Sequence, residues 1–176
     1  MNKSIRCFLI LFNLSKPINF GNLIRTANAF GVTPIAVGKK DFSRCGATAK
    51  TRRTKVLHFY TLEEAIDFVR SQGCSLVGVE INPDSKSITK QPFTGSTAFL
   101  MGNEGEGLIP KQIAMCDALV YIPQYGDAIS LNVNVAAGIV LQQFADWAGF
   151  PETHRQGSKY AVDDAAVAEI EFTPDD

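Results

Sequence analysis

The sequence predicts one α/β domain with a mostly parallel sheet flanked by helices. Short apolar runs alternate along the chain with segments of helical periodicity, as in folds whose parallel strands are buried on both faces. The chain has 176 residues, of which 45% are hydrophobic, so it can bury a sizeable core. Since no repeat or long linker divides it, we expect a domain over residues 1–150 and a polar, acidic tail over 151–176.

The strands are expected where short apolar runs end at turn-forming residues. Residues 5–12 are the first such run, and the stretch 19–22, rich in Asn and Gly, interrupts the pattern. A helix follows to about residue 30, with Gly31 as its stop. Further strands are expected over residues 34–37, 56–59, 76–79, 98–101 and 119–122.

Three more helices are expected between and after these strands. Thr61 and Glu64 form the pattern of an N-cap with a capping box, which predicts a helix to about residue 72. A short helix is expected around residues 110–115. Ser130 is the expected N-cap of a long helix that continues to about Trp147. Because that helix is apolar on almost all sides, it belongs in the core or in an interface.

Composition excludes several classes of protein. The longest apolar run holds six residues, Cys7–Phe12, far short of the ~20 that span a bilayer and too short for a signal peptide. The four cysteines show no CxxC spacing, which argues against zinc or a redox pair. We therefore expect a cytoplasmic protein that uses no metal and no membrane.

The net charge of −1 conceals a strong asymmetry between the two parts of the chain. Residues 1–60 hold eleven bases and one acid, whereas residues 61–176 hold six bases and seventeen acids. Seven of the bases lie between Lys39 and Lys55. Such a run forms either a solvated face or a phosphate-binding surface. On the second interpretation Lys50, Arg52 and Arg53 contact phosphate groups of a ligand.

Three stretches carry residues suited to chemistry. In residues 19–27, NFGNLIRTA, Asn and Gly precede a helix at the edge where such sheets bind ligands, and Arg25 is expected to point back at it. Residues 102–108, GNEGEGL, form a Gly-rich loop with the pattern GxxGxG and not the dinucleotide pattern GxGxxG. The loop carries two carboxylates, Glu104 and Glu106, which would repel a pyrophosphate and attract a cation. Residues 122–133, IPQYGDAISLNV, lead into the last helix.

Taken together, in this order and spacing, the three stretches resemble the motifs of the SpoU (TrmH-type) RNA ribose 2′-O-methyltransferases of the SPOUT superfamily. The resemblance implies a C-terminal trefoil knot, S-adenosylmethionine as cofactor and tRNA or rRNA as substrate. It also implies a homodimer in which the last helix lies in the interface and the active site is shared.

The resemblance also assigns residues. The cofactor-binding positions it implies are Val79, Glu80, Gly102, Ile122 and Leu131. The catalytic positions it implies are Asn19, Arg25, Glu104, Ser130 and Asn132. Family accounts give the activation of the ribose hydroxyl to the position of Arg25, but an arginine stays protonated in proteins. A role in gripping a substrate phosphate suits Arg25 better, and the identity of the base stays open.

Two positions depart from the family pattern, and they leave open a second hypothesis about the function. Gln124 stands where the family commonly has Met, and Asn134 where it commonly has Ser. A SPOUT-like dimer that binds RNA with little or no catalysis is therefore the second hypothesis. A nucleotide-dependent oxidoreductase is the third, and it rests only on the α/β pattern and the Gly-rich loop.

Overall fold

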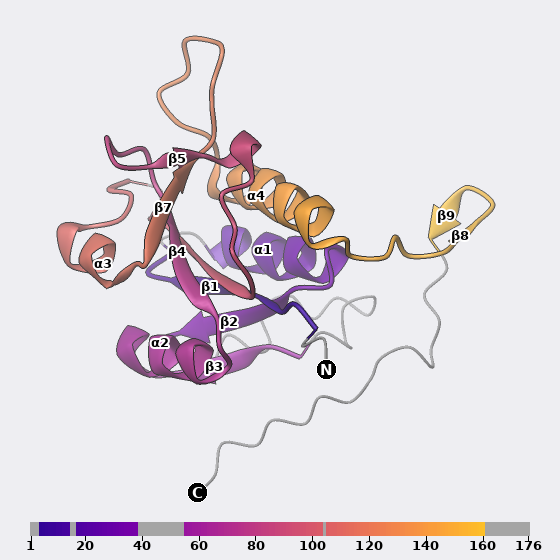
Figure 1. The fold of residues 1–176 in the computed structure, drawn as a ribbon, viewed down its shortest axis with the longest axis horizontal. Coiled ribbons are helices and arrows are strands. Elements are labelled where there is room, and N and C mark those ends of the chain that lie inside the picture. Colours follow the sequence, from indigo (N-terminus) through magenta and orange to yellow (C-terminus); the bar gives the residue numbers. More distant parts are fainter. Residues whose placement is uncertain (1–3, 15–16, 39–54, 104, 161–176) are drawn as a thin grey trace, which may run out of the picture.

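The computed structural model describes residues 4–14, 17–38, 55–103 and 105–160, and its centre is a seven-stranded sheet (Figure 1). The strand order is β3-β2-β1-β6-β4-β7-β5, and every pairing in this sheet is parallel. The strands are β1 (Cys7–Phe12), β2 (Thr33–Val37), β3 (Leu57–Phe59), β4 (Ser75–Val79), β5 (Lys86–Ser87), β6 (Thr97–Met101) and β7 (Ala118–Tyr121).

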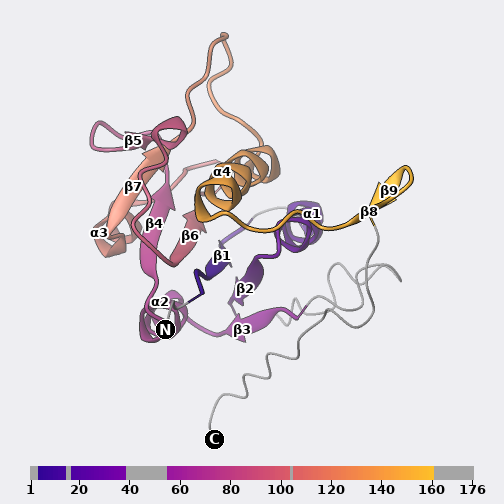
Figure 2. The same cartoon turned by 45° about the vertical axis from the view of Figure 1, so that its right-hand side comes forward.

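Helices cover both faces of this sheet. Figure 2 shows α1 and α4 on one face and α2 on the other. The helices are α1 (Pro17–Ala29), α2 (Leu62–Ser71), the 3₁₀ helix η1 (Ile88–Lys90), α3 (Pro110–Met115) and α4 (Val133–Ala148). A hairpin of β8 (Arg155–Gln156) and β9 (Lys159–Tyr160) follows, beyond the sheet. Among the described residues no helix is both long and apolar enough to cross a bilayer.

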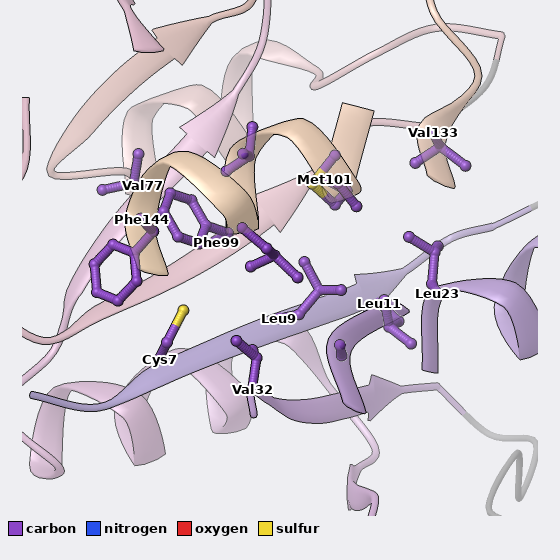
Figure 3. Packing of buried hydrophobic residues seen from close by; sticks show 14 of the residues in the cluster. Cys7, Leu9, Leu11, Leu23, Val32, Val77, Phe99, Met101, Val133 and Phe144 are labelled. Carbon is purple, nitrogen blue, oxygen red and sulfur yellow. The ribbon is translucent and has the colours of Figure 1, made fainter. Parts of the chain in front are cut away.

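Side-chain alternation along the strands divides the core into two halves. Cys7, Leu9 and Leu11 of β1 face α1 and α4, together with Val77, Phe99 and Met101 from the neighbouring strands (Figure 3). Phe8 and Ile10 point the other way, into the half of the core that holds the buried side of α2. Since successive side chains of a strand point to opposite faces, a strand apolar at every position must be covered twice.

Aromatic packing holds α4 on the sheet. The ring of Phe144, which is fully buried, lies 5.1 Å from that of Phe93 and 5.6 Å from that of Phe99. Trp147 and Phe150 pack on Phe144 from farther along the chain, with ring centroids 5.5 and 5.9 Å away. These edge and tilted contacts are the arrangements that aromatic rings favour, so the position of α4 over β6 is well defined.

The α/β class and most of the expected elements are confirmed. The sheet is parallel, as predicted, and α2 begins with the expected capping box. The Thr61 hydroxyl accepts from the Glu64 amide at 3.2 Å, and the Glu64 carboxylate accepts from the Thr61 amide at 3.1 Å. The short elements β5, η1, β8 and β9 lie in stretches for which no element was expected, because their sequences are polar and irregular.

Two boundary predictions are wrong. First, α1 begins at Pro17, so the stretch 19–22 lies in its first turns and not in a preceding loop. Second, the N-cap of α4 is Asn132 and not Ser130: the Asn132 side chain accepts from the Asn134 amide at 2.9 Å. Asparagine caps helices as well as serine does, and the residues before Asn132 continue the loop from β7.

Candidate functional site

A cavity of about 470 Å³ lies at the carboxyl ends of three adjacent strands, β6, β4 and β7. Each strand contributes its last residues and those that follow: Met101 and Gly102, Val79 and Glu80, Tyr121 and Ile122. Asn19 of α1 and the segment 129–133 close the remaining sides. Residues far apart in the sequence therefore share one wall, because parallel strands end at a common edge.

The loop after β6 folds back on itself beside the cavity. The Asn103 and Gly107 backbones exchange hydrogen bonds of 3.0 and 2.9 Å. A Cβ atom on Gly102 would lie 2.9 Å from two backbone atoms of Gly107, closer than real Cβ atoms approach. The loop can close in this way only with glycine at position 102, since backbone passes where a side chain would begin.

Glu80 fixes the far end of this loop. One carboxylate oxygen accepts from the Leu108 amide at 2.6 Å, and the other accepts from the Ile81 amide at 2.9 Å. Gly107 also lies in the cavity wall, next to Glu80. Its φ is +68°, and a Cβ atom on this residue would collide with the Glu80 carboxylate. Charge-assisted hydrogen bonds of this kind are short and strong. Glu80 therefore joins the end of β4 to the loop after β6.

Asn103 fixes the near end of the loop, a role that was not predicted. Its side-chain amide donates to the Asn13 carbonyl at 2.6 Å, and its oxygen accepts from the Gly105 amide at 2.8 Å. The first bond joins the loop after β6 to the end of β1. The available signal was an asparagine between glycines, a residue that commonly bonds to nearby backbone.

The structure brings most of the predicted site residues together. All five expected cofactor positions lie in the cavity wall, as do three of the expected catalytic positions. The cavity-wall residues among the predictions are Val79, Glu80, Gly102, Ile122, Leu131, Asn19, Ser130 and Asn132. Sequence reasoning missed Ile81 and Ile129, which also line the cavity although they are 63% and 94% exposed.

The remaining predicted residues lie elsewhere. Arg25 is exposed on α1, more than two turns from its start, and does not line the cavity. Glu104, Lys50, Arg52 and Arg53 lie outside the described residues.

The two positions that depart from the family pattern differ in their placement. Gln124 lines the cavity. Asn134 does not: its side-chain oxygen accepts from the Thr26 hydroxyl at 2.8 Å and so ties α4 to α1. This bond also provides the specific partner expected for a polar side chain in an apolar helix.

The charges of the cavity wall are negative. Its described charged residues are Glu80 and Glu106, with no Lys or Arg among them. The described wall also contains no His or Cys, so it offers hydroxyl, amide and carboxylate groups and no activated nucleophile. Outside the cavity, just before the start of β7, burial and the charge of Asp117 raise the pKa of the Cys116 thiol to about 11, which keeps it protonated at neutral pH. Within the described ranges no cluster of ligands suits a metal ion.

The fold is an open parallel α/β sheet with a cavity at the carboxyl ends of its strands, the position where sheets of this class bind ligands. The sequence model of the SpoU rRNA Methylase family matches residues 6–142, and the chain belongs to this family. The predicted resemblance is thereby confirmed.

Relatives and solved structures agree with this assignment. The chain is 35% identical to the 23S rRNA (guanosine-2'-O-)-methyltransferase RlmB of Coxiella burnetii, over 77% of this chain and 56% of that protein. It is 31% identical to RlmB of Acinetobacter baylyi, over 81% of this chain and 60% of that protein. The chain thus matches less than two thirds of these relatives.

Two solved structures with similar folds were determined with a ligand. An AdoMet-bound rRNA methyltransferase from Sinorhizobium meliloti gives a TM-score of 0.71 at 27% identity, covering 82% of this chain and 57% of that one. The SpoU methyltransferase AviRb from Streptomyces viridochromogenes, in complex with AdoMet, gives 0.70 at 25% identity, covering 84% and 62%.

The contacts of Glu80 predict a measurable loss of stability. Glu80→Ala leaves the buried Leu108 amide without its acceptor and should lower the free energy of unfolding by about 2 kcal/mol. Urea denaturation measures this loss, and hydrogen exchange at the Leu108 amide should accelerate. Glu106→Ala removes an exposed carboxylate from the same loop and should change stability by less than about 0.5 kcal/mol. Equal losses in the two variants would contradict the role given to Glu80.

Proposed function

We propose that this chain transfers a methyl group from S-adenosylmethionine to a ribose 2′-hydroxyl of RNA, either tRNA or rRNA. The observation that carries the proposal is the shared cavity wall: residues of all three motifs line one cavity at the end of the sheet. Membership of the SpoU family and the names of the RlmB relatives support the same reaction.

The cavity suits the proposed cofactor in volume and charge. Its volume lies within the usual range for small-molecule sites. Val79, Ile122 and Leu131 offer an apolar surface to a nucleoside, and Gly102 contributes backbone to the same wall. Negative charge on the wall favours a cation, and S-adenosylmethionine, when bound, supplies a methyl group on a positively charged sulfur. These residues, with Glu80 holding the loop, are the proposed cofactor site.

The proposed catalytic work of the chain is mainly orientation. Asn19, Ser130 and Asn132 carry amide and hydroxyl groups at the cavity wall, where they can hold a ribose in place. Holding reacting groups in an attack geometry can by itself provide several kcal/mol. Arg25 is proposed to grip a substrate phosphate, which suits its exposed position and fixed charge. Glu104 is proposed as the remaining catalytic residue on the family pattern alone.

We propose that the chain forms a homodimer and that exposed apolar side chains of α1 and α4 lie in its interface. Ile18 of α1 is 70% exposed and Val135 of α4 is 49% exposed, although these two helices pack against one another over a buried core. A second copy of the chain would cover these side chains. Since Arg25 does not line the cavity of its own chain, the dimer also offers it a place at the partner's cavity, as a shared active site requires.

The finer organisation of the chain is proposed on the family pattern. The trefoil knot would form in the C-terminal part of a catalytic domain over residues 1–150, with residues 151–176 as a tail. The family match, which ends at residue 142, supports this division. An RNA substrate favours the cytoplasm as the place of action.

Methyl transfer tests the proposed function directly. Incubation with labelled S-adenosylmethionine and tRNA or rRNA should yield a 2′-O-methylated nucleotide, identified by mass spectrometry of the digested RNA. Arg25→Ala should lower the transfer rate by about 100-fold or more and leave cofactor binding unchanged, because the guanidinium orients RNA and not cofactor.

The control for this variant is Lys90→Ala, which removes an exposed cation from η1 and should leave the rate unchanged. Normal turnover by Arg25→Ala would refute the role of that residue. Cofactor binding without transfer to any RNA would favour the alternative, a dimer that binds RNA without catalysis.

The run of seven bases between Lys39 and Lys55, called here the basic segment, predicts a change in the salt dependence of RNA binding. Replacing Lys50, Arg52 and Arg53 with Ala should reduce the slope of log K against log salt by about one unit for each lost phosphate contact. Filter binding at several salt concentrations measures the slope.

A triple replacement of Lys86, Lys90 and Lys159 changes the net charge equally and should have a smaller effect on the slope. An equal effect in both triple variants would show that net charge, and not the basic segment, governs binding.

The proposed dimer predicts a change in molecular mass. Val135→Lys places a charge in the apolar surface of α4 and should shift the protein from dimer to monomer in sedimentation velocity, because burying an unpaired charge is costly. Ala114→Lys, on the exposed side of α3, should leave the mass unchanged. A wild-type protein that sediments as a monomer at every concentration would refute the dimer.

A further inference from the structure

Gln124 places an unsatisfied polar atom in the cavity wall. Its side-chain oxygen, Oε1, is closed off from solvent, and no donor among the described residues reaches it. The residue follows Ile122 in the wall and precedes the segment 129–133 that closes the cavity. Buried acceptors in proteins almost always have a partner, so an acceptor without one at a ligand cavity points to a partner that the ligand supplies.

The side-chain acceptors of Glu80 and Asn132, which also lie in the wall, are already engaged. Both carboxylate oxygens of Glu80 accept from backbone amides, those of Ile81 and Leu108, and the Asn132 oxygen caps α4. Gln124 thus differs from these neighbours in having an oxygen still to satisfy. Its terminal amide turns about a broad torsional minimum, so the oxygen can meet a donor inside the cavity.

We infer that Gln124 is a specificity-determining residue of this cavity, whose side-chain oxygen accepts a hydrogen bond from an N–H group of the bound nucleoside cofactor. The inference rests on the proposed function, because S-adenosylmethionine is the ligand that brings these N–H groups. It carries two kinds, the amino group of the adenine ring and the ammonium of the methionine part. Gln124 recognises one of them.

Gln124→Met is the informative substitution, because methionine has similar length and no strong acceptor. Two opposite effects are expected. Affinity for S-adenosylhomocysteine, measured by calorimetry, should fall about five- to tenfold as the hydrogen bond is lost. The melting temperature of the ligand-free protein should rise by about 2–4 °C, because an unsatisfied buried acceptor has been removed. A residue with a merely structural role would not give this combination.

Two ligand analogues identify the donor. S-inosylhomocysteine lacks the ring amino group, and 5′-methylthioadenosine lacks the ammonium. If the ring amino group is the donor, Gln124→Met should lower the affinity for 5′-methylthioadenosine and leave the affinity for S-inosylhomocysteine unchanged. If the ammonium is the donor, the pattern should be reversed. Either pattern supports the inference. Gln156→Met, on exposed β8, is the matched control and should change neither affinity nor melting temperature.

The remaining outcomes overturn the inference. Unchanged affinity of Gln124→Met for S-adenosylhomocysteine, or equal weakening of the binding of all three ligands, would show that the oxygen accepts from neither N–H group. A lower melting temperature of the ligand-free variant would show that Gln124 already has a structural partner. Wild-type protein that binds neither S-adenosylmethionine nor S-adenosylhomocysteine would overturn the proposed function as well, whereas the other outcomes leave that function standing.

Discussion

Parallel pairing of β1, β6, β4 and β7 is the constraint on which the site depends. The registers pair Cys7 with Thr97, Ser75 with Thr97 and Val77 with Ala118, so these strands run together and end at one edge. The segments that follow them are thereby delivered to the same place. Short loops after these strands are therefore enough to bring their side chains into one cavity wall.

Hydrogen bonds from side chains to backbone hold the loop after β6 in a fixed position at this edge. Asn103 bonds to the carbonyl of Asn13 after β1, and Glu80 after β4 bonds to the amide of Leu108. The loop after β6 is therefore held from both sides by its neighbouring strands. A cavity wall made of constrained backbone can be formed before a ligand arrives, which lowers the cost of ordering on binding.

The sequence predicted the sheet because its strands are apolar at successive positions, as in Cys7–Phe12, and predicted α2 because Thr61 and Glu64 form a local capping pattern. It located the cavity because the motifs follow strands. It could not show that Arg25 lies outside the cavity wall, since that depends on how α1 is oriented against α4. It also missed Asn103 and the tie between Thr26 and Asn134, because those partners lie about 90 and 108 residues apart.

The central place of β1 has a consequence for synthesis of the chain. This strand lies between β2 and β6, and its partner residues in β6 begin at Thr97, ninety residues after Cys7. At translation rates of ~5–20 residues per second, one edge of β1 waits about 5–18 s for its neighbour to be made. During that interval an apolar strand has an open edge, which is prone to wrong pairing. Long-range parallel pairing of this kind also folds slowly, which lengthens the interval in which wrong pairing can occur.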